Sequence, residues 1–355
     1  MITYTVNNNK MRIEMKEIKS LTGIRGIAAL YVVLYHTVGS IIFPNGYLAV
    51  DLFFILSGFI MCVVYNDSFN DSITIKDYTN FMLHRFARIY PLYIFLVALA
   101  IIAFYAFGKH FTAKEILSNI LLIQNLGLSK SIVGPSWSVS VEFILYLFFP
   151  FVFFLCSKFR AIKYFLWMLC FSLYFYITKS HSEFIIGSSD GKGGLDLWKH
   201  DGVGAVLRGF AGFCSGVFIY FLYRANFHNI IKKSLSQILI TLSICIIIYF
   251  TSNLDILCTI LFQALILSLA LNENGLVSKI LQSNIIMYMG RISFSIYLVH
   301  FLIGEFVWNY IKIPNTCISP RLVSILIIIS LSFISAHILH KYVELPARKY
   351  IRKKL

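Results

Sequence analysis

Arg25 and His36 lie inside the first apolar segment of the chain. Ionisable side chains are costly within a membrane, so each is a functional candidate unless it reaches an interface or pairs with a neighbour. Their spacing of eleven positions returns to nearly the same face of an α-helix, roughly 16 Å further along its axis. A neutral imidazole in such a place could act as a base. The alternative is a histidine that bonds to a neighbouring helix for structural reasons.

Arg85 and Arg88 form a second group, a pair of arginines three positions apart beside another apolar segment. On an α-helix this spacing places both on one face, where two guanidinium groups can bind phosphate groups. Ordinary contact with lipid phosphates at the membrane boundary is the alternative. On spacing alone we favour that alternative.

The elements that carry these residues are expected to be membrane helices. Of the 355 residues, 58% are hydrophobic and only 13% are charged, about half the charged share of a soluble domain. Runs such as Ile238–Phe250, Ile256–Leu271 and Leu322–Ile338 contain almost no charge over lengths close to those of a membrane span. The short alternating segments of an outer-membrane barrel are missing. The sequence therefore predicts an all-α polytopic membrane protein.

Hydropathy predicts about ten transmembrane helices. They cover about 23–43, 48–65, 88–107, 139–156, 161–178, 203–222, 237–252, 255–271, 291–311 and 321–340. Most Lys and Arg residues fall on the inner segments if both termini are cytoplasmic, which is the usual bias of membrane proteins. Arg208 then counts with the outer segments. Topology thus accounts for the 31 Lys and Arg against 16 Asp and Glu, and we expect no nucleic acid partner.

The predicted organisation has three parts. Residues 1–20 form a cytoplasmic N-terminal segment, residues 21–341 a transmembrane domain, and residues 342–355 a basic cytoplasmic tail. The first 20 residues are polar and lack an apolar run, so we expect the first span to act as an uncleaved insertion signal.

Two predicted outer loops are long enough to border a polar substrate. The loop at 108–138 contains an amphipathic segment at Ala113–Leu126, and the loop at 179–202 is rich in Gly, Ser and charged residues. Seven cysteines occur, but they form no CxxC pair and six lie in or beside apolar spans. We therefore expect neither a disulfide framework nor a metal site.

Four ordered segments carry a resemblance to a known family. The segment Leu21–Leu30, followed by His36, resembles the opening motif of the acyltransferase-3 family of integral membrane O-acyltransferases. Val50–Phe59 is similar to the family's second-span motif, His84–Pro91 to its RxxR segment, and Trp137–Glu142 to its W-S-x-S-x-E motif. The order and spacing together are far more specific than any one motif alone.

Weaker closing motifs also match, at Ile292–His300 and Glu344–Pro346. Two positions depart from the family pattern. Thr22 replaces the acidic residue that commonly precedes the arginine of the first motif, and Phe143 replaces the second of two glutamates often seen after the tryptophan motif. Roles that need those extra carboxylates are in doubt.

The resemblance implies transfer of an acyl group, usually acetyl from acetyl-CoA on the cytoplasmic side, to a hydroxyl of an extracytoplasmic carbohydrate. O-antigen, capsule and exopolysaccharide are acceptors of this kind, and the bacterial cytoplasmic (inner) membrane is the implied location. Arg85 and Arg88 would bind the nucleotide end of CoA, and Arg25 would help to hold CoA or the local structure.

Five further residues are expected to meet the substrate. Asp51 and Glu142 are placed in the outer portions of their spans, and Trp137 offers an aromatic face for a sugar ring or, alternatively, belongs to the interfacial aromatic belt. The Ser57 hydroxyl could line a pore, although a bond to its own backbone is favoured. His300 is a second candidate acid or base for which we favour a structural hydrogen bond.

The expected mechanism has His36, oriented by a neighbouring polar group, as general base on the acceptor hydroxyl. A second version has His36 itself acetylated as a transient acyl carrier. The rival class is a transporter or flippase for a glycan-lipid, and a third reading is an acyltransferase for a non-glycan acceptor. A homo-oligomer is left open.

Overall fold

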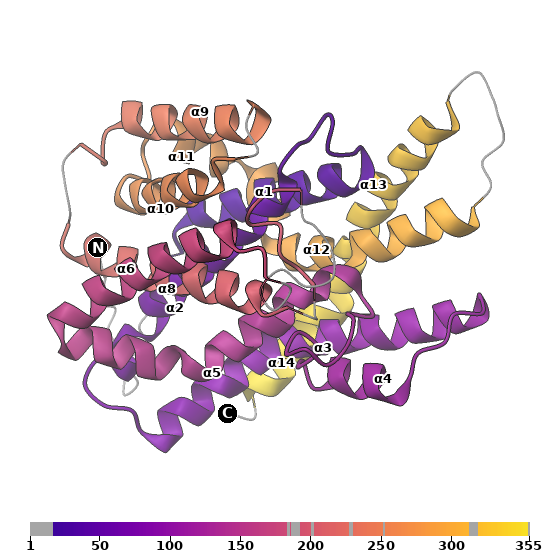
Figure 1. Ribbon diagram of the computed structural model, residues 1–355, viewed down its shortest axis with the longest axis horizontal. Helices are drawn as coiled ribbons and strands as arrows, with labels where there is room; N and C mark the ends of the chain where they lie inside the picture. The colour runs from indigo at the N-terminus through magenta and orange to yellow at the C-terminus, as the bar shows by residue number, and fades with distance from the viewer. Residues whose placement is uncertain are drawn as a thin grey trace.

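The computed structural model describes residues 17–182, 185, 192–199, 202–226, 230–250, 253–311 and 319–353. Within these ranges every regular element is a helix, as Figure 1 shows. Seven of the described helical segments are long and apolar enough to cross a membrane, and two shorter helices are also apolar. The prediction of an all-α polytopic membrane protein is confirmed.

The principal helices follow one another along the chain. They are α1 (Lys19–Thr37), α2 (Ala49–Phe69), α3 (Ile75–Ala106), α4 (Ala113–Ile120), α5 (Trp137–Lys158), α6 (Arg160–Lys179), α8 (Gly204–Arg224), α9 (Ser234–Phe250), α10 (Asp255–Leu271), α11 (Leu276–Leu281), α12 (Asn284–Tyr310), α13 (Pro320–Leu339) and α14 (Leu345–Lys353). Each of the ten predicted spans coincides with one of these helices. The number that cross the membrane and the side of the termini stay predictions.

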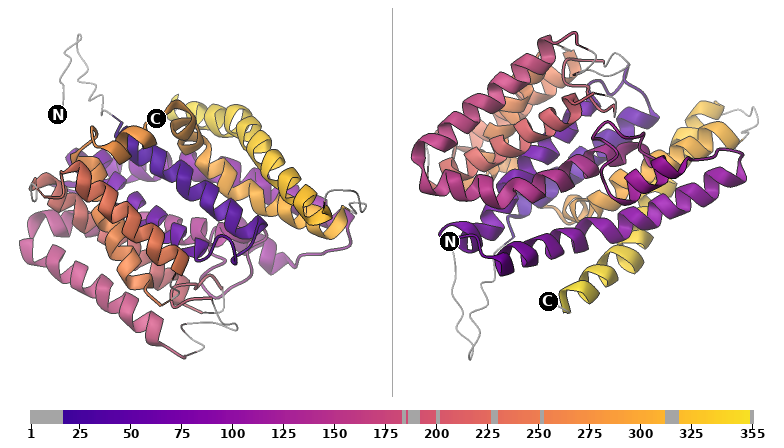
Figure 2. Two further views of the ribbon diagram at one scale, coloured as in Figure 1. Left: turned by 90° about the horizontal axis from the view of Figure 1, so that it is seen from above. Right: turned by 60° about the horizontal axis from the view of Figure 1, so that its bottom comes forward.

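The packing of the bundle depends on two close helix pairs, α1 with α12 and α2 with α8 (Figure 2). A Cβ added to Gly290 on α12 would lie 2.0 Å from the carbonyl oxygen of Thr22 on α1, and one added to Gly216 on α8 would lie 2.0 Å from that of Ile55 on α2. Only glycine permits such backbone approach, which is how membrane helices maximise packing. The α9, α10 and α11 helices gather at one edge (Figure 1).

Two helix boundaries differ from the predicted spans for identifiable local reasons. The α3 helix starts at Ile75 rather than near 88, because the Thr74 hydroxyl accepts a hydrogen bond from the backbone N–H of Asp77 and caps the helix. The α1 helix ends at Thr37 rather than near 43, shortly before Gly39, which has a left-handed φ of 109°. A polar cap and a glycine turn, rather than hydropathy, thus set these two helix ends.

The amphipathic segment predicted at 113–126 is confirmed in part. The α4 helix begins with a capping box between Thr112 and Glu115 but ends at Ile120, and Leu122 then takes a left-handed φ of 57°. Of the polar loop predicted at 179–202, residues 183–184, 186–191 and 200–201 lie outside the described residues.

The C-terminal region is folded onto the bundle. After α13 the chain forms one π-helical turn, His340–Glu344, and continues into α14, which packs against α3 (Figure 1). Much of the segment predicted as a basic tail is therefore a helix beside the helix that carries Arg85 and Arg88.

Candidate functional site

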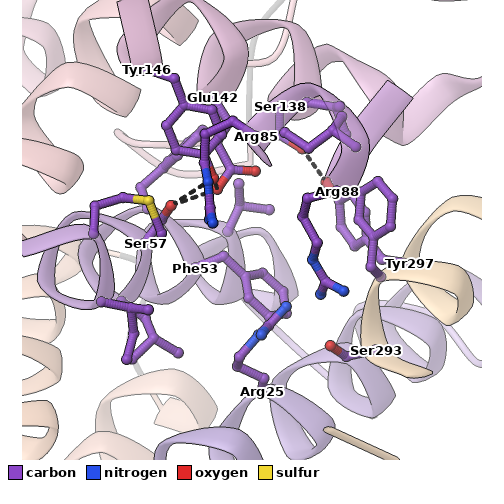
Figure 3. Close-up of a pocket in the computed structure, with 18 residues that line it drawn as sticks. Arg25, Phe53, Ser57, Arg85, Arg88, Ser138, Glu142, Tyr146, Ser293 and Tyr297 are labelled. Atoms are coloured by element: carbon purple, nitrogen blue, oxygen red, sulfur yellow. Dashed lines mark hydrogen bonds between the residues drawn. The ribbon is translucent and has the colours of Figure 1, made fainter. Parts of the chain in front are cut away.

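An internal pocket, here called the arginine pocket, is lined by Arg25 from α1 and by Arg85 and Arg88 from α3 (Figure 3). Its cavity volume is about 160 Å³. Helices α2, α5 and α12 complete its wall. The prediction placed the arginine pair at the end of a span, whereas α3 extends about three turns further toward the N-terminus.

The guanidinium groups of Arg25 and Arg88 point toward the same part of the pocket (Figure 3). Arg88 forms an ion pair with the buried Glu344. Arg85 donates to the Tyr65 hydroxyl at 3.0 Å, while its buried Nε has no hydrogen-bond partner among the described residues. Converging cations with an unused donor are suited to a ligand that carries several negative charges, such as a group with phosphates.

A carboxylate bonded to two hydroxyl groups lies beside these cations. Glu142 on α5 accepts hydrogen bonds from the hydroxyls of Ser57 on α2 and Tyr146 on α5, both at 2.6 Å (Figure 3). The Ser57 side chain thus bonds to Glu142 rather than to its own backbone. The prediction grouped Glu142 with the outer residues, but the structure places it in the arginine pocket because α5 turns this face toward α2 and α3.

A second and larger space, here called the histidine vestibule, is lined by His36 together with Tyr35, Tyr47, Trp137 and Arg208. Its cavity volume is about 990 Å³. Loop residues border it as well, among them Ser40, Lys192, Asp196 and Trp198, together with Arg321 at the start of α13. Aromatic faces alternate there with donors and acceptors, which is the composition that suits a hydroxyl-rich ligand.

His36 and His300 form a hydrogen-bonded pair, with 3.1 Å between Nδ1 of His36 and Nε2 of His300. The rings are stacked, and Nδ1 of His300 lies 3.1 Å from the Ile296 carbonyl oxygen. That carbonyl can only accept, so in a neutral pair Nδ1 of His300 carries the hydrogen and its Nε2 accepts from His36. Nε2 of His36 is then left with a lone pair, as a base requires.

Tyr297 and Val50 line both the arginine pocket and the histidine vestibule. Tyr297 lies one turn before His300 on α12, and its hydroxyl is 2.9 Å from that of Ser138 (Figure 3). The two spaces therefore adjoin each other, and the histidine pair lies just beyond the shared wall.

Asp51 is placed differently from the prediction. Its carboxylate is fully buried and binds the guanidinium of Arg208 through Nε at 3.0 Å and Nη2 at 2.6 Å. Arg208 also donates to the Tyr47 carbonyl. Arg208 was counted with the outer segments, but it lies inside α8, because its charge is balanced there by Asp51. Direct contact of Asp51 with substrate stays a prediction.

The sequence reasoning missed Arg208, Tyr146, Tyr297 and Glu344 as members of this region. Arg208 carried the same signal as Arg25, a charge within an apolar span. Tyr297 and Glu344 lie in the two closing motifs, in which His300 was the only residue given a role. Tyr146 had no signal beyond its spacing of four from Glu142, which places both on one helical face.

Metal ligands do not gather in the described part of the chain, where no group of three or more His, Cys, Asp or Glu side chains is placed to hold an ion. The expectation of metal-free chemistry stays a prediction.

Comparison with known proteins gives the family. A family profile described as an acyltransferase domain, acyltransferase-3, matches residues 18–340. The chain belongs to the acyltransferase-3 family, and the resemblance noted from its motifs is confirmed.

Several curated relatives match at lower coverage. Acyltransferase MdmB of Streptomyces mycarofaciens is 31% identical over 153 residues, 37% of this chain and 38% of the relative. Protein 2 in the picA locus of Rhizobium radiobacter is 43% identical over 89 residues, 24% and 44% of the two chains. A Staphylococcus aureus protein named as a provisional O-acetyltransferase is 24% identical over an alignment of 375 positions, which covers 95% of this chain and 58% of the relative. The chain thus spans only 38–58% of the length of these relatives. No solved structure gives a significant match.

The ion pair of Asp51 and Arg208 gives a prediction for stability. Asp51→Ala leaves a buried, unpaired guanidinium and should lower the free energy of unfolding by about 3–5 kcal/mol. The double variant Asp51→Ala with Arg208→Met removes both charges and should recover part of that loss. Thermal unfolding in detergent measures both. A single variant as stable as the wild type would contradict the structural role of the pair.

Proposed function

We propose that this protein is an O-acyltransferase that moves an acetyl group from cytoplasmic acetyl-CoA to a hydroxyl of an extracytoplasmic glycan, with His36 as the general base. The observation that carries the proposal is the adjacency of two unlike spaces. A cation-lined pocket suited to a phosphate-bearing donor shares a wall with a vestibule that contains a histidine pair and aromatic faces.

The donor assignment rests on the arginine pocket. The phosphates of CoA carry the negative charges that Arg25, Arg85 and Arg88 can meet, and the buried Nε of Arg85 supplies a donor that the described protein groups leave unused. The pocket adjoins α14 and Glu344, at the end of the bundle that charge bias assigns to the cytoplasm. This supports entry of the donor from that side.

The acceptor assignment rests on the vestibule. Trp137 offers an aromatic face, and Asp196, Lys192 and Tyr35 supply polar groups around the exposed His36. A pyranose packs its C–H face on aromatic rings and presents hydroxyls to such groups. A non-glycan alcohol could use the same chemistry and is the alternative acceptor.

The reaction needs one proton transfer at His36. The acceptor oxygen attacks the thioester carbonyl carbon as its proton moves to Nε2 of His36. The C–S bond then breaks, and the CoA thiolate leaves and takes up that proton, which returns the imidazole to its neutral form. His300 supports this step, because its Nε2 holds the Nδ1–H of His36 and fixes the tautomer with a free Nε2. Direct transfer requires the acyl donor and the acceptor to be bound to the protein at the same time. An acyl-histidine relay would instead use the same lone pair of His36 as the nucleophile.

A glycan-lipid flippase is the competing function. Charged groups lining a pathway would serve it equally well, but an internal pocket with three arginines beside a histidine pair is not needed for translocation. Membership of the acyltransferase-3 family favours the covalent reaction. Release of CoA from acetyl-CoA by the purified protein would distinguish the two, because a flippase has no reason to cleave a thioester. The proposed location is the bacterial inner membrane.

His36→Ala should reduce acyl transfer by roughly 10²–10⁴-fold, because the general base is lost. Transfer is followed as CoA released from acetyl-CoA, and the amount of protein in the membrane is measured in parallel. His337→Ala is the matched control, since that histidine lies on α13 and bonds Tyr288 away from both spaces. Full activity in a normally expressed His36→Ala protein would remove His36 from the mechanism.

His300→Leu removes the acceptor for the Nδ1–H of His36 and should lower kcat at least roughly tenfold with little change in the KM for acetyl-CoA. His300→Gln places an amide oxygen near the position of Nε2 and should retain more activity. Steady-state kinetics at several pH values separates the two variants. Equal activities for leucine and glutamine would argue against tautomer control by His300.

Arg85→Ala combined with Arg88→Ala should raise the KM for acetyl-CoA by about tenfold or more, since charge-assisted hydrogen bonds each contribute about 1.5–3 kcal/mol. S-acetylpantetheine lacks the nucleotide phosphates, so its KM should hardly change. Arg224→Ala is the control, because Arg224 bonds Asn66 outside both spaces. An unchanged KM for acetyl-CoA would count against phosphate binding at this pair.

A further inference from the structure

The arginine pocket and the histidine vestibule share part of their lining. Of the residues that line each space, Val50 and Tyr297 line both. The neighbours on either side are consecutive in the chain, with Ser138 lining the pocket and Trp137 lining the vestibule. The wall is therefore built from one turn of α12, the start of α2 and the start of α5.

Tyr297 is held in this wall by hydroxyl contacts. Its side chain is 7% exposed, its hydroxyl lies 2.9 Å from the Ser138 hydroxyl, and it donates to the Pro135 carbonyl oxygen at 3.2 Å. Ser138 also donates to that carbonyl, at 3.1 Å. Two hydroxyls thus share one backbone acceptor, and Figure 3 shows the Tyr297–Ser138 contact at the margin of the pocket.

The tyrosine ring has aromatic neighbours on both sides of the wall. The Phe53 ring, which lines the arginine pocket, lies 5.9 Å away in an edge contact, and the His300 ring lies 6.1 Å away toward the vestibule. An acyl group bound as a thioester among the arginines must pass this ring to come within reach of His36. The space beside Tyr297 then decides which acyl groups can arrive.

We propose that Tyr297, together with Ser138, forms the passage between the two spaces and limits the length of the acyl group that is transferred. The inference rests on the proposed function, because it assigns the thioester to the arginine pocket and the base to the vestibule. Tyr297 is a specificity-determining residue in this account. Its ring excludes longer chains, and its hydroxyl contacts hold the ring in place.

The chemistry of the wall fits a short acyl group. An acetyl group adds one methyl beyond the carbonyl, whereas each further methylene must be accommodated between Tyr297, Val50 and Phe53, which leave little room in a packed interior. Discrimination by roughly 10–200-fold for one methylene is usual in an apolar site of fixed shape. The wild-type protein is therefore expected to prefer acetyl-CoA over butyryl-CoA and hexanoyl-CoA.

The test compares CoA release from these three donors by the full-length protein in detergent. Tyr297→Ala should raise the ratio of kcat/KM for hexanoyl-CoA to that for acetyl-CoA by roughly tenfold or more. Tyr297→Phe keeps the ring and should keep the acetyl preference. Tyr297→Leu is a second enlarging variant that retains apolar bulk, in case the alanine protein does not fold.

Tyr93→Ala is the matched control, because this buried tyrosine on α3 bonds the Asn119 carbonyl away from both spaces. It removes as much side chain, and the donor ratio should stay that of the wild type. If the wild type is active but the folded Tyr297→Ala and Tyr297→Leu proteins keep its ratio of kcat/KM for hexanoyl-CoA to that for acetyl-CoA, the role of Tyr297 in the passage is overturned. A folded wild type that releases CoA from none of the donors instead overturns the proposed function.

Discussion

The close contact between α1 and α12 is the constraint on which the rest of the site depends. Where Gly290 meets Thr22, the two backbones approach so closely that no side chain fits between them. The helices run in the same direction from this contact, so His36 and His300 arrive at the same level and can share a hydrogen bond. Arg25 lies on the same helix between the contact and the histidine. The glycine contacts between these helices thereby set how far Arg25, in the arginine pocket, lies from His36.

Much of the fold could be predicted from the sequence, since uninterrupted apolar runs leave few alternatives to membrane helices. The helix ends could not be predicted from hydropathy, because Thr74 acts through a cap and Gly39 through its backbone angle, and neither changes the hydropathy of the segment. In the site, Arg25 and His36 were found because an ionisable residue within an apolar segment is conspicuous, whereas Arg85 and Arg88 were singled out by their spacing and by the resemblance to the RxxR segment. The pairing of His36 with His300, and of Asp51 with Arg208, depends on which helix faces become neighbours. No spacing within a single helix contains that information.

The carboxylates illustrate the same limit. Asp51 and Glu142 look alike in the sequence, each near the start of its apolar segment. In the structure Asp51 neutralises a buried arginine, while Glu142 collects two hydroxyls in the arginine pocket. Each charge has found a counter-charge or hydrogen-bond donors, as burial demands. A buried ion pair makes the scaffold specific at some cost in desolvation, whereas a carboxylate with hydroxyl partners keeps lone pairs that a ligand can use.

The π-helical turn at His340–Glu344 connects the C-terminal helix α14 to the arginine pocket. Glu344 binds Arg88, accepts hydrogen bonds from Ser295 and His340, and lies directly before α14. Anything that displaces α14 would withdraw the counter-charge of an arginine in the pocket. A fusion partner joined directly after α14 is consequently placed where it can disturb this ion pair.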